Sequence, residues 1–229
     1  MLDIYKFSRF SYAYCLGHET TASALTWAIY IIAKYPEIQK ELRNEVQSLL
    51  PPPLHDTSSI VIAETIEKMS YLKAVCSEIL RLFSPVSVTI RVAVRDTSIC
   101  SQPIVKGTTV MIPVWAVNAS NELWGADAGE FVPERWMRNK STGDDPNVSS
   151  NGGKGSNYNF LTFLHGPRAC IGQTFAVGEL SCLLAAWVGA FETELEDADL
   201  VPVVKGGITA KPKGGVHVRV KPVGSADTK

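Results

Sequence analysis

The segment from Phe163 to Gly172 constrains this chain more than any other part of its sequence. It reads Phe-Leu-His-Gly-Pro-Arg-Ala-Cys-Ile-Gly, and it places Cys170 on a glycine-flanked loop directly before an apolar helical pattern. Free backbone N–H groups and the positive end of the macrodipole at a helix start favour a thiolate over a thiol. The segment therefore predicts a sulfur ligand for a soft metal centre, and a buried cysteine in a reverse turn is the alternative interpretation.

The residues around this sulfur suit a flat ligand that carries a negative charge. Gly166 and Gly172 lack a Cβ, so the backbone can approach a planar cofactor closely at both positions. Arg168 lies shortly before Cys170 and can pair with an anionic group on that cofactor. The cysteines of the chain show no Cys-x-x-Cys spacing, so we expect neither a disulfide framework nor a structural zinc site.

Composition places the chain among ordinary globular domains. It has 229 residues, of which 45% are hydrophobic and 20% charged, and a formal net charge of -1. Acidic and basic residues are interspersed, so we expect no nucleic-acid partner. The longest apolar runs are shorter than the ~20 residues of a membrane-spanning helix, and the amino terminus lacks the pattern of a signal peptide. We therefore expect no transmembrane or targeting segment in this chain.

Hydrophobic periodicity predicts a mainly α chain with small β-sheets. Apolar residues recur at helical spacing in several segments, and Pro36 stands at a favoured first-turn position of one of them. From Trp115 onward the chain is expected to be mostly irregular, with a surface loop over 140–157. The predicted helices cover residues 12–35, 37–50, 59–68, 71–83 and 172–191, the predicted strands 88–94 and 109–114, and a predicted hairpin 201–220.

The loop around Cys170 has the pattern Phe-x-x-Gly-x-Arg-x-Cys-x-Gly, which resembles the haem-binding loop of the cytochromes P-450. The chain looks like a fungal member of that haem-thiolate monooxygenase family. The resemblance implies that Cys170 is the thiolate ligand to the iron of haem b. It also implies that the other cofactor-binding positions of this loop are Phe163, Gly166, Arg168 and Gly172.

Two further motifs match the same family in order and spacing. Glu78-Ile-Leu-Arg81 is an i, i+3 ion pair, which taken alone is common on exposed helix faces. The segment Phe131–Trp136 looks like the family's meander, whose arginine joins that helix pair. The resemblance therefore implies that Glu78, Arg81 and Arg135 form a buried ion network, in which the loss of one member strands a charge.

The run from Gly17 to Thr21 resembles the family's oxygen-activation motif. By this resemblance Glu19 and Thr20 are catalytic residues that relay protons, because heterolytic cleavage of the O–O bond needs them. A threonine pair that bonds back to its own helix is the alternative interpretation. The motif also departs from the family, since Leu16 stands where a small residue is usual and its side chain could crowd the oxygen pocket.

The same resemblance assigns a further cofactor contact and a substrate pocket. Arg91 matches an arginine that contacts a haem propionate, and an ordinary exposed strand charge is the alternative. Residues 86–89 and 207–209 match the segments that line the substrate pocket, and their apolar and hydroxyl side chains suit a small apolar substrate. The pocket positions are Val86, Val88, Ile208 and Thr209.

The resemblance covers residues 15–222 and implies a partial cytochrome P-450 fold. This part runs from the distal long helix through the Cys-loop to the last long helix and a terminal β-hairpin. Residues 1–14 are atypical of the family, which is the pattern of a mis-assigned start, and residues 223–229 form a tail. We expect the membrane anchor and first helices of the family to be absent here, and for the parent enzyme the resemblance implies the endoplasmic-reticulum membrane.

The implied function is a haem-thiolate monooxygenase that oxidises a small apolar organic substrate with dioxygen. Its electrons would come from NADPH through a flavoprotein reductase, and haem iron would be its only metal. The alternative hypothesis is a truncated, non-catalytic remnant of such an enzyme with weak or no haem binding. A family member that rearranges peroxides without a reductase is disfavoured, because Glu19 and Thr20 are retained and that chemistry needs no proton relay.

Overall fold

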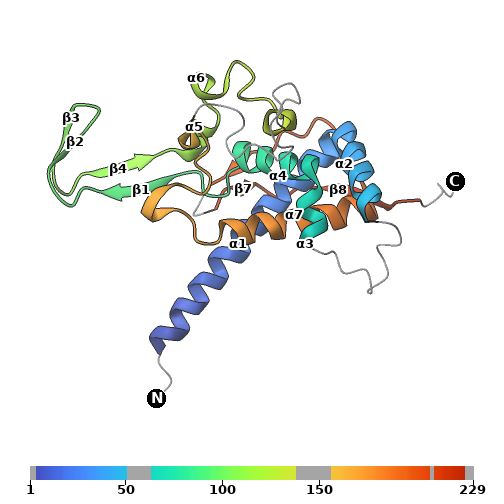
Figure 1. The fold of residues 1–229 in the computed structure, drawn as a ribbon, viewed down its shortest axis with the longest axis horizontal. Coiled ribbons are helices and arrows are strands. Elements are labelled where there is room, and N and C mark those ends of the chain that lie inside the picture. The colour runs from blue at the N-terminus through green and yellow to red at the C-terminus, as the bar shows by residue number, and fades with distance from the viewer. Residues whose placement is uncertain (1–3, 51–62, 138–155, 207–208, 225–229) are drawn as a thin grey trace.

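The fold consists of packed helices with small antiparallel sheets at the periphery (Figure 1). The computed structural model describes residues 4–50, 63–137, 156–206 and 209–224. The helices are α1 (Ile4–Lys34), α2 (Pro36–Leu49), α3 (Ala63–Lys68), α4 (Ser70–Leu82), α5 (Val114–Asn118), α6 (Asn121–Trp124) and α7 (Gln173–Ala190). Short 3-10 turns are η1 (Pro133–Trp136), η3 (Asn157–Asn159) and η4 (Gly166–Arg168).

The main core lies where α1, α2, α4 and α7 pack against one another. Trp27 of α1 stacks on Phe83, with 4.4 Å between the ring centroids. By length and composition alone α7 could cross a membrane. Its residues Leu180, Leu184 and Val188 are buried against the other helices, and 28% of the helix is buried in the structure.

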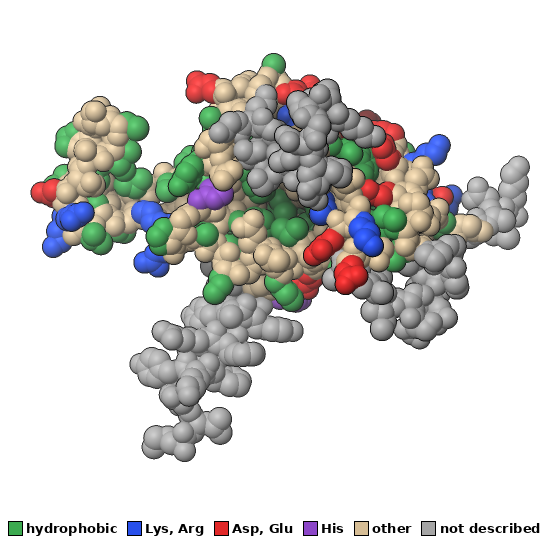
Figure 2. Space-filling view, in the orientation of Figure 1, with side chains coloured by type: hydrophobic (Ala, Val, Ile, Leu, Met, Phe, Trp, Pro, Cys, Tyr) green, Lys and Arg blue, Asp and Glu red, His purple; other side chains and the backbone are tan. Residues whose placement is uncertain are grey.

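Antiparallel strand pairs make up the β part of the described chain. The strands are β1 (Thr89–Val92), β2 (Thr97–Ile99), β3 (Gln102–Ile104), β4 (Thr109–Ile112), β5 (Phe191–Leu195), β6 (Val204–Lys205), β7 (Lys211–Pro212) and β8 (Val218–Pro222). The β1–β4 and β2–β3 pairs form an arm that projects from the helices (Figure 1), and hydrophobic side chains are exposed along it (Figure 2). The β5–β8 and β6–β7 pairs lie beside the helical core.

The helix and strand predictions differ from the structure mainly at their ends. The first helix begins at Ile4 rather than at residue 12, because residues 4–11 contain no Gly or Pro that would stop it. The stretch after Trp115 is less irregular than predicted, since it includes the end of α5 and all of α6. The predicted surface loop 140–157 and the start of the helix predicted at 59–68 lie largely outside the described residues.

The predicted terminal hairpin is wrong in its strand pairing. Its two β-branched runs do not pair along their length, because β8 pairs with β5 while β6 forms only a short ladder with β7. Strand β5 is anchored beside α2 by Gln39, which donates to the carbonyl of Thr193 at 2.8 Å and accepts from its N–H at 2.9 Å. This anchor leaves the other edge of β5 open to β8. The last helix ends at Ala190, directly before β5 begins.

Candidate functional site

A cavity of about 660 Å³ opens between α1, the loop that carries Cys170 and the first turns of α7. Its walls are mostly apolar side chains, with threonine hydroxyls among them. Cavities of this size and lining typically bind organic ligands or cofactors. Of the residues predicted from sequence, those that line it are Thr20, Val86, Phe163, Arg168, Cys170 and Gly172.

The loop around Cys170 is held in shape by its own backbone. The N–H of Cys170 donates to the carbonyl of Phe163 at 2.8 Å, which closes the loop. Gly166 has a φ of +71°, in the left-handed region that favours glycine, and Leu164 adopts the same region with a φ of +56°. A bulky residue rarely takes this conformation, so the loop is strained at a position that lines the cavity. Gly172 then forms the N-cap of α7.

Large apolar side chains stand uncovered beside the sulfur. Cys170 itself is exposed, Ile171 is fully exposed, and 75% of Phe175 is exposed, although all three line the cavity. Gly172 lies beside the sulfur, since a Cβ at this position would be in ordinary van der Waals contact with the Cys170 Sγ at 4.0 Å. Side chains of this type are usually buried, and their exposure here indicates a surface for an apolar ligand.

The donor set fits the iron of a porphyrin better than a bare metal ion. Among the described residues, no group of three or more His, Cys, Asp or Glu side chains could hold a metal. Haem iron is held largely by the porphyrin itself, so a single thiolate from the protein would be enough to bind it. The apolar walls suit the faces of the ring, and Arg168 adds a cation to the lining.

Helix α1 supplies another wall of the cavity through Gly17 and Thr20. Thr20 is half-buried, and its Oγ1 donates to the carbonyl of Gly17 at 3.2 Å, as expected of a threonine that bonds within its own helix. Glu19 is exposed and lies outside the lining, where its Oε1 is 3.5 Å from the Nζ of Lys211 on β7. The structure therefore places Thr20 at the cavity and Glu19 toward β7.

The remaining predicted positions lie around β1 and the β6–β7 loop. Val88 is half-buried outside the lining, and Thr209 is buried. Ile208 falls outside the described residues. Arg91 is exposed on β1, and its Nη1 donates to the Thr89 Oγ1 and the Ile90 carbonyl at 2.8 Å each. Arg91 therefore lies two residues along β1 from Thr89, which lines the cavity.

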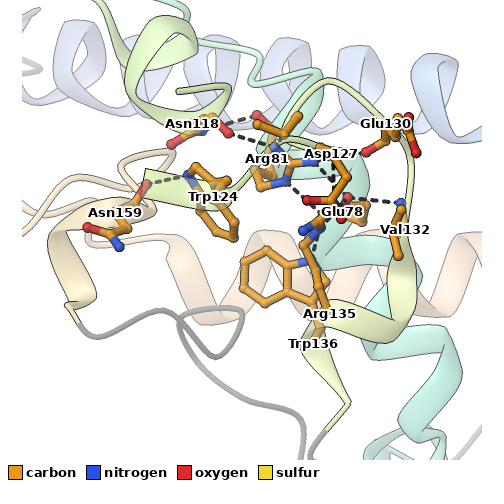
Figure 3. A network of polar contacts seen from close by, with 11 residues as sticks. Glu78, Arg81, Asn118, Trp124, Asp127, Glu130, Val132, Arg135, Trp136 and Asn159 are labelled. Carbon is orange, nitrogen blue, oxygen red and sulfur yellow. Dashed lines mark hydrogen bonds and ion pairs between the residues drawn. The ribbon is translucent and has the colours of Figure 1, made fainter. Parts of the chain in front are cut away.

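A buried ion network joins Glu78, Arg81 and Arg135, and Figure 3 shows how their side chains converge. Glu78 and Arg81 are fully buried on α4 and form a bidentate pair, with the Arg81 Nε and Nη2 at 2.8 and 2.7 Å from the two carboxylate oxygens. The Arg135 Nε donates to the Glu78 Oε1 at 2.9 Å. The carboxylate also accepts from the Val132 N–H at 3.0 Å and from the Trp136 Nε1 at 2.7 Å.

Every member of this network is held by several partners. The Arg81 Nη1 donates to the carbonyls of Asn118 and Ala128 at 2.7 Å each. Burial opposes the charge of Arg135, but the Glu78 carboxylate and a contact with Asp127 outweigh it, so the pKa of Arg135 is raised above its ordinary value. Both guanidinium groups are paired with the Glu78 carboxylate, which compensates their burial.

Sequence reasoning missed several residues that complete this site. Trp124 lies 4.8 Å from the Arg81 guanidinium across its ring face, and its Nε1 donates to the Asn159 carbonyl at 3.2 Å. Trp136 follows Arg135 directly, so an indole beside a predicted buried carboxylate was an available signal. Asn118 is fully buried and gave no signal, because its partners are distant in sequence.

Comparison with known proteins identifies the family of this chain. The cytochrome P-450 family model matches residues 14–218. A cytochrome P-450 monooxygenase of Aspergillus fumigatus is 48% identical over 207 residues, covering 90% of this chain and 37% of that protein. Similar monooxygenases of Alternaria alternata (41% over 233 residues, covering 90% and 39%) and Petromyces alliaceus (35% over 210 residues, covering 90% and 38%) also match.

A helical fold with small sheets, a cysteine loop at the start of a long helix and an apolar cavity lined by that loop are the features expected of a haem-thiolate protein. This chain belongs to the cytochrome P-450 family. The family implies a haem cofactor. The chain spans less than two fifths of the length of these three curated relatives.

Proposed function

We propose that this chain supplies the thiolate side of a monooxygenase site that oxidises a small apolar organic substrate. The cavity carries the proposal, because an exposed cysteine and uncovered apolar side chains line the same space as Thr20 of α1. The three fungal relatives are monooxygenases, which supports the same reaction type for this chain. In this proposal haem b, when bound, would supply the activation of dioxygen, so that one oxygen atom enters the substrate and the other leaves as water with the uptake of two electrons and two protons. Electrons come from NADPH through a flavoprotein reductase.

Cys170 is the residue that would hold the iron. Its backbone is fixed by the bond to Phe163, so the sulfur is presented to the cavity without rearrangement of the loop. Phe163, Gly166 and Gly172 shape the loop so that a flat ring can approach. Arg168 in the lining and Arg91 on β1 would pair with the anionic groups of the cofactor.

Thr20 and Glu19 would hold and transfer protons on the α1 side. The Thr20 hydroxyl lies at the cavity wall and can pass on a proton from its Oγ1 when it releases the Gly17 carbonyl. Glu19 faces solvent and Lys211. It can take up a proton from that side and supply it to Thr20. The substrate would contact Val86, which lines the cavity, while Val88, Ile208 and Thr209 are proposed as pocket residues from the family resemblance alone.

Haem titration of the purified chain tests the proposal. We expect saturable binding with a thiolate-type carbon-monoxide difference band, and loss of that band in Cys170→Ala. Cys100→Ala is the matched control, because Cys100 is also exposed but lies on the β2–β3 turn. A thiolate-type band that survives in Cys170→Ala would refute the ligand assignment. Absence of saturable binding in the unmodified chain would instead favour the truncated, non-catalytic remnant.

A further inference from the structure

Asn118 joins the buried ion network to the segment that leads into the cysteine loop. It ends α5, is fully buried, and uses both ends of its carboxamide. The Nδ2 donates to the Arg81 carbonyl at 3.1 Å and to the Thr162 Oγ1 at 2.8 Å, while the Oδ1 accepts from the Leu161 N–H at 2.9 Å. Its own carbonyl accepts from the Arg81 Nη1 at 2.7 Å.

The direction of each of these bonds follows from the partners. The Thr162 hydroxyl donates its only proton to the Leu80 carbonyl at 2.8 Å, so its oxygen must accept from Asn118. The Arg81 carbonyl can only accept, and the Leu161 N–H can only donate. A carboxamide satisfies all three partners, whereas a carboxylate of the same shape would place an oxygen against two acceptors.

A continuous chain of contacts leads from Asn118 to the sulfur. Leu161 and Thr162 directly precede Phe163, and the Phe163 carbonyl accepts from the Cys170 N–H at 2.8 Å. Thr162 and Phe163 also line the cavity. A shift of this segment would therefore move both the cavity wall and the backbone that supports Cys170.

We infer that Asn118 is a positioning residue, which fixes the segment 161–163 against α4 and so sets the place of the Cys170 sulfur in the cavity. This inference rests on the proposed function, in which that sulfur binds haem iron. The ion network secures one side of Asn118 through Arg81, and Asn118 transmits that rigidity to the loop. Loss of its donors should loosen the loop more than it loosens the fold.

The test compares Asn118→Asp and Asn118→Ala with Gln39→Glu and Gln39→Ala in the full chain. Gln39 is a matched control, because it is also a buried carboxamide, and its Nε2 donates to the carbonyls of Ile32 and Thr193 at 2.8 Å each. It serves the α2–β5 contact and lies outside the cavity lining. Each variant is titrated with haem b, its carbon-monoxide difference spectrum is recorded, and amide hydrogen exchange is measured without haem.

We expect thiolate-type haem binding to weaken about tenfold in both Asn118 variants. A buried polar group left without its hydrogen-bond partner loses a free energy that corresponds to about a tenfold change in an equilibrium constant. The amides of Leu161 and Cys170 should exchange about tenfold faster than in the unmodified chain, while those of β5 and β8 keep their rates. The Gln39 variants should show the opposite pattern, with faster exchange in β5 and an unchanged thiolate spectrum.

Two results would overturn the inference. Unchanged exchange at Leu161 and Cys170 in Asn118→Ala would show that the loop does not depend on this residue, whatever the result of the haem titration. An equal loss of the thiolate band in the Gln39 variants would show general destabilisation instead of positioning. The proposed function fails separately, if the unmodified chain shows no thiolate band or Cys170→Ala keeps one, and the link from Asn118 to the iron then fails with it.

Discussion

Replacement of Glu78 by glutamine is the sharpest test of the buried network. Its carboxylate accepts from the Arg81 Nε and Nη2, from the Arg135 Nε, from the Val132 N–H and from the Trp136 Nε1. Glutamine has nearly the same shape but carries no charge, and its amide nitrogen must face donors whichever way it is turned. Glu78→Gln therefore leaves the fully buried Arg81 without a countercharge.

The expected loss follows from this geometry. Breaking a buried pair by removing one partner costs about 3–5 kcal/mol, because an uncompensated charge stays in the interior. The whole free energy of unfolding of a domain is about 5–15 kcal/mol, so this single change would bring the chain close to unfolding. With a urea dependence of about 2 kcal/mol per molar, the unfolding midpoint should fall by roughly 2 M.

Urea unfolding followed by tryptophan fluorescence measures this effect, since Trp124 and Trp136 stand within the network. Glu192→Gln is the matched control, because Glu192 is 54% exposed and its oxygen lies 4.0 Å from Arg43. An exposed pair of this kind contributes about 0–1 kcal/mol. If Glu78→Gln lowers the free energy of unfolding no more than this control does, water reaches the network. The expected loss would then be refuted, because it depends on a charge that is shielded from water.

Burial raises the pKa of the Cys76 thiol from 9.0 to about 12. The unfolded chain therefore loses this proton first, so the contribution of Cys76 to stability is fully present below about pH 9 and falls by about 1.4 kcal/mol per pH unit between about pH 9 and pH 12; equal slopes over that range in Cys76→Ala would contradict this. Arg91→Ala should change the free energy of unfolding by less than about 0.5 kcal/mol and weaken haem binding about tenfold, and an unchanged haem titration would remove Arg91 from the cofactor site. Trp124→Phe should cost about 1–3 kcal/mol in urea unfolding, because the Asn159 carbonyl loses its donor and Arg81 a better ring; a smaller loss would show that water replaces the indole.

Local sequence determines the parts of this fold that could be predicted. Helix α2 follows from Pro36 and its apolar stripe, and the Cys-loop follows from the glycines and the helix start beside Cys170. The contacts of Asn118 and the pairing of β5 with β8 could not be predicted, because each depends on residues far apart in the sequence. Their partners are chosen by packing of the whole domain, which periodicity does not describe.

The separation of Glu19 from Thr20 is a case in which geometry qualifies the motif. An α-helix turns by about 100° per residue, so neighbouring side chains leave it in different directions. Thr20 lies in the cavity wall, whereas Glu19 lies outside the lining and contacts Lys211. The two residues can thus transfer a proton only in successive steps. The Glu19 carboxylate faces solvent, and the Thr20 hydroxyl faces the cavity.

The polar and apolar groups at the cavity have different roles in binding a flat ligand. Among the described residues, no buried side-chain nitrogen or oxygen lacks a hydrogen-bond partner. Two large apolar side chains at the site are uncovered, those of Ile171 and Phe175, and Arg168 and Cys170 are exposed beside them. Apolar burial is not directional, so these surfaces can hold a flat ring but cannot orient it. Orientation must come from the Cys170 sulfur and the Arg168 cation, whose geometry depends on the rigidity of the loop that carries both.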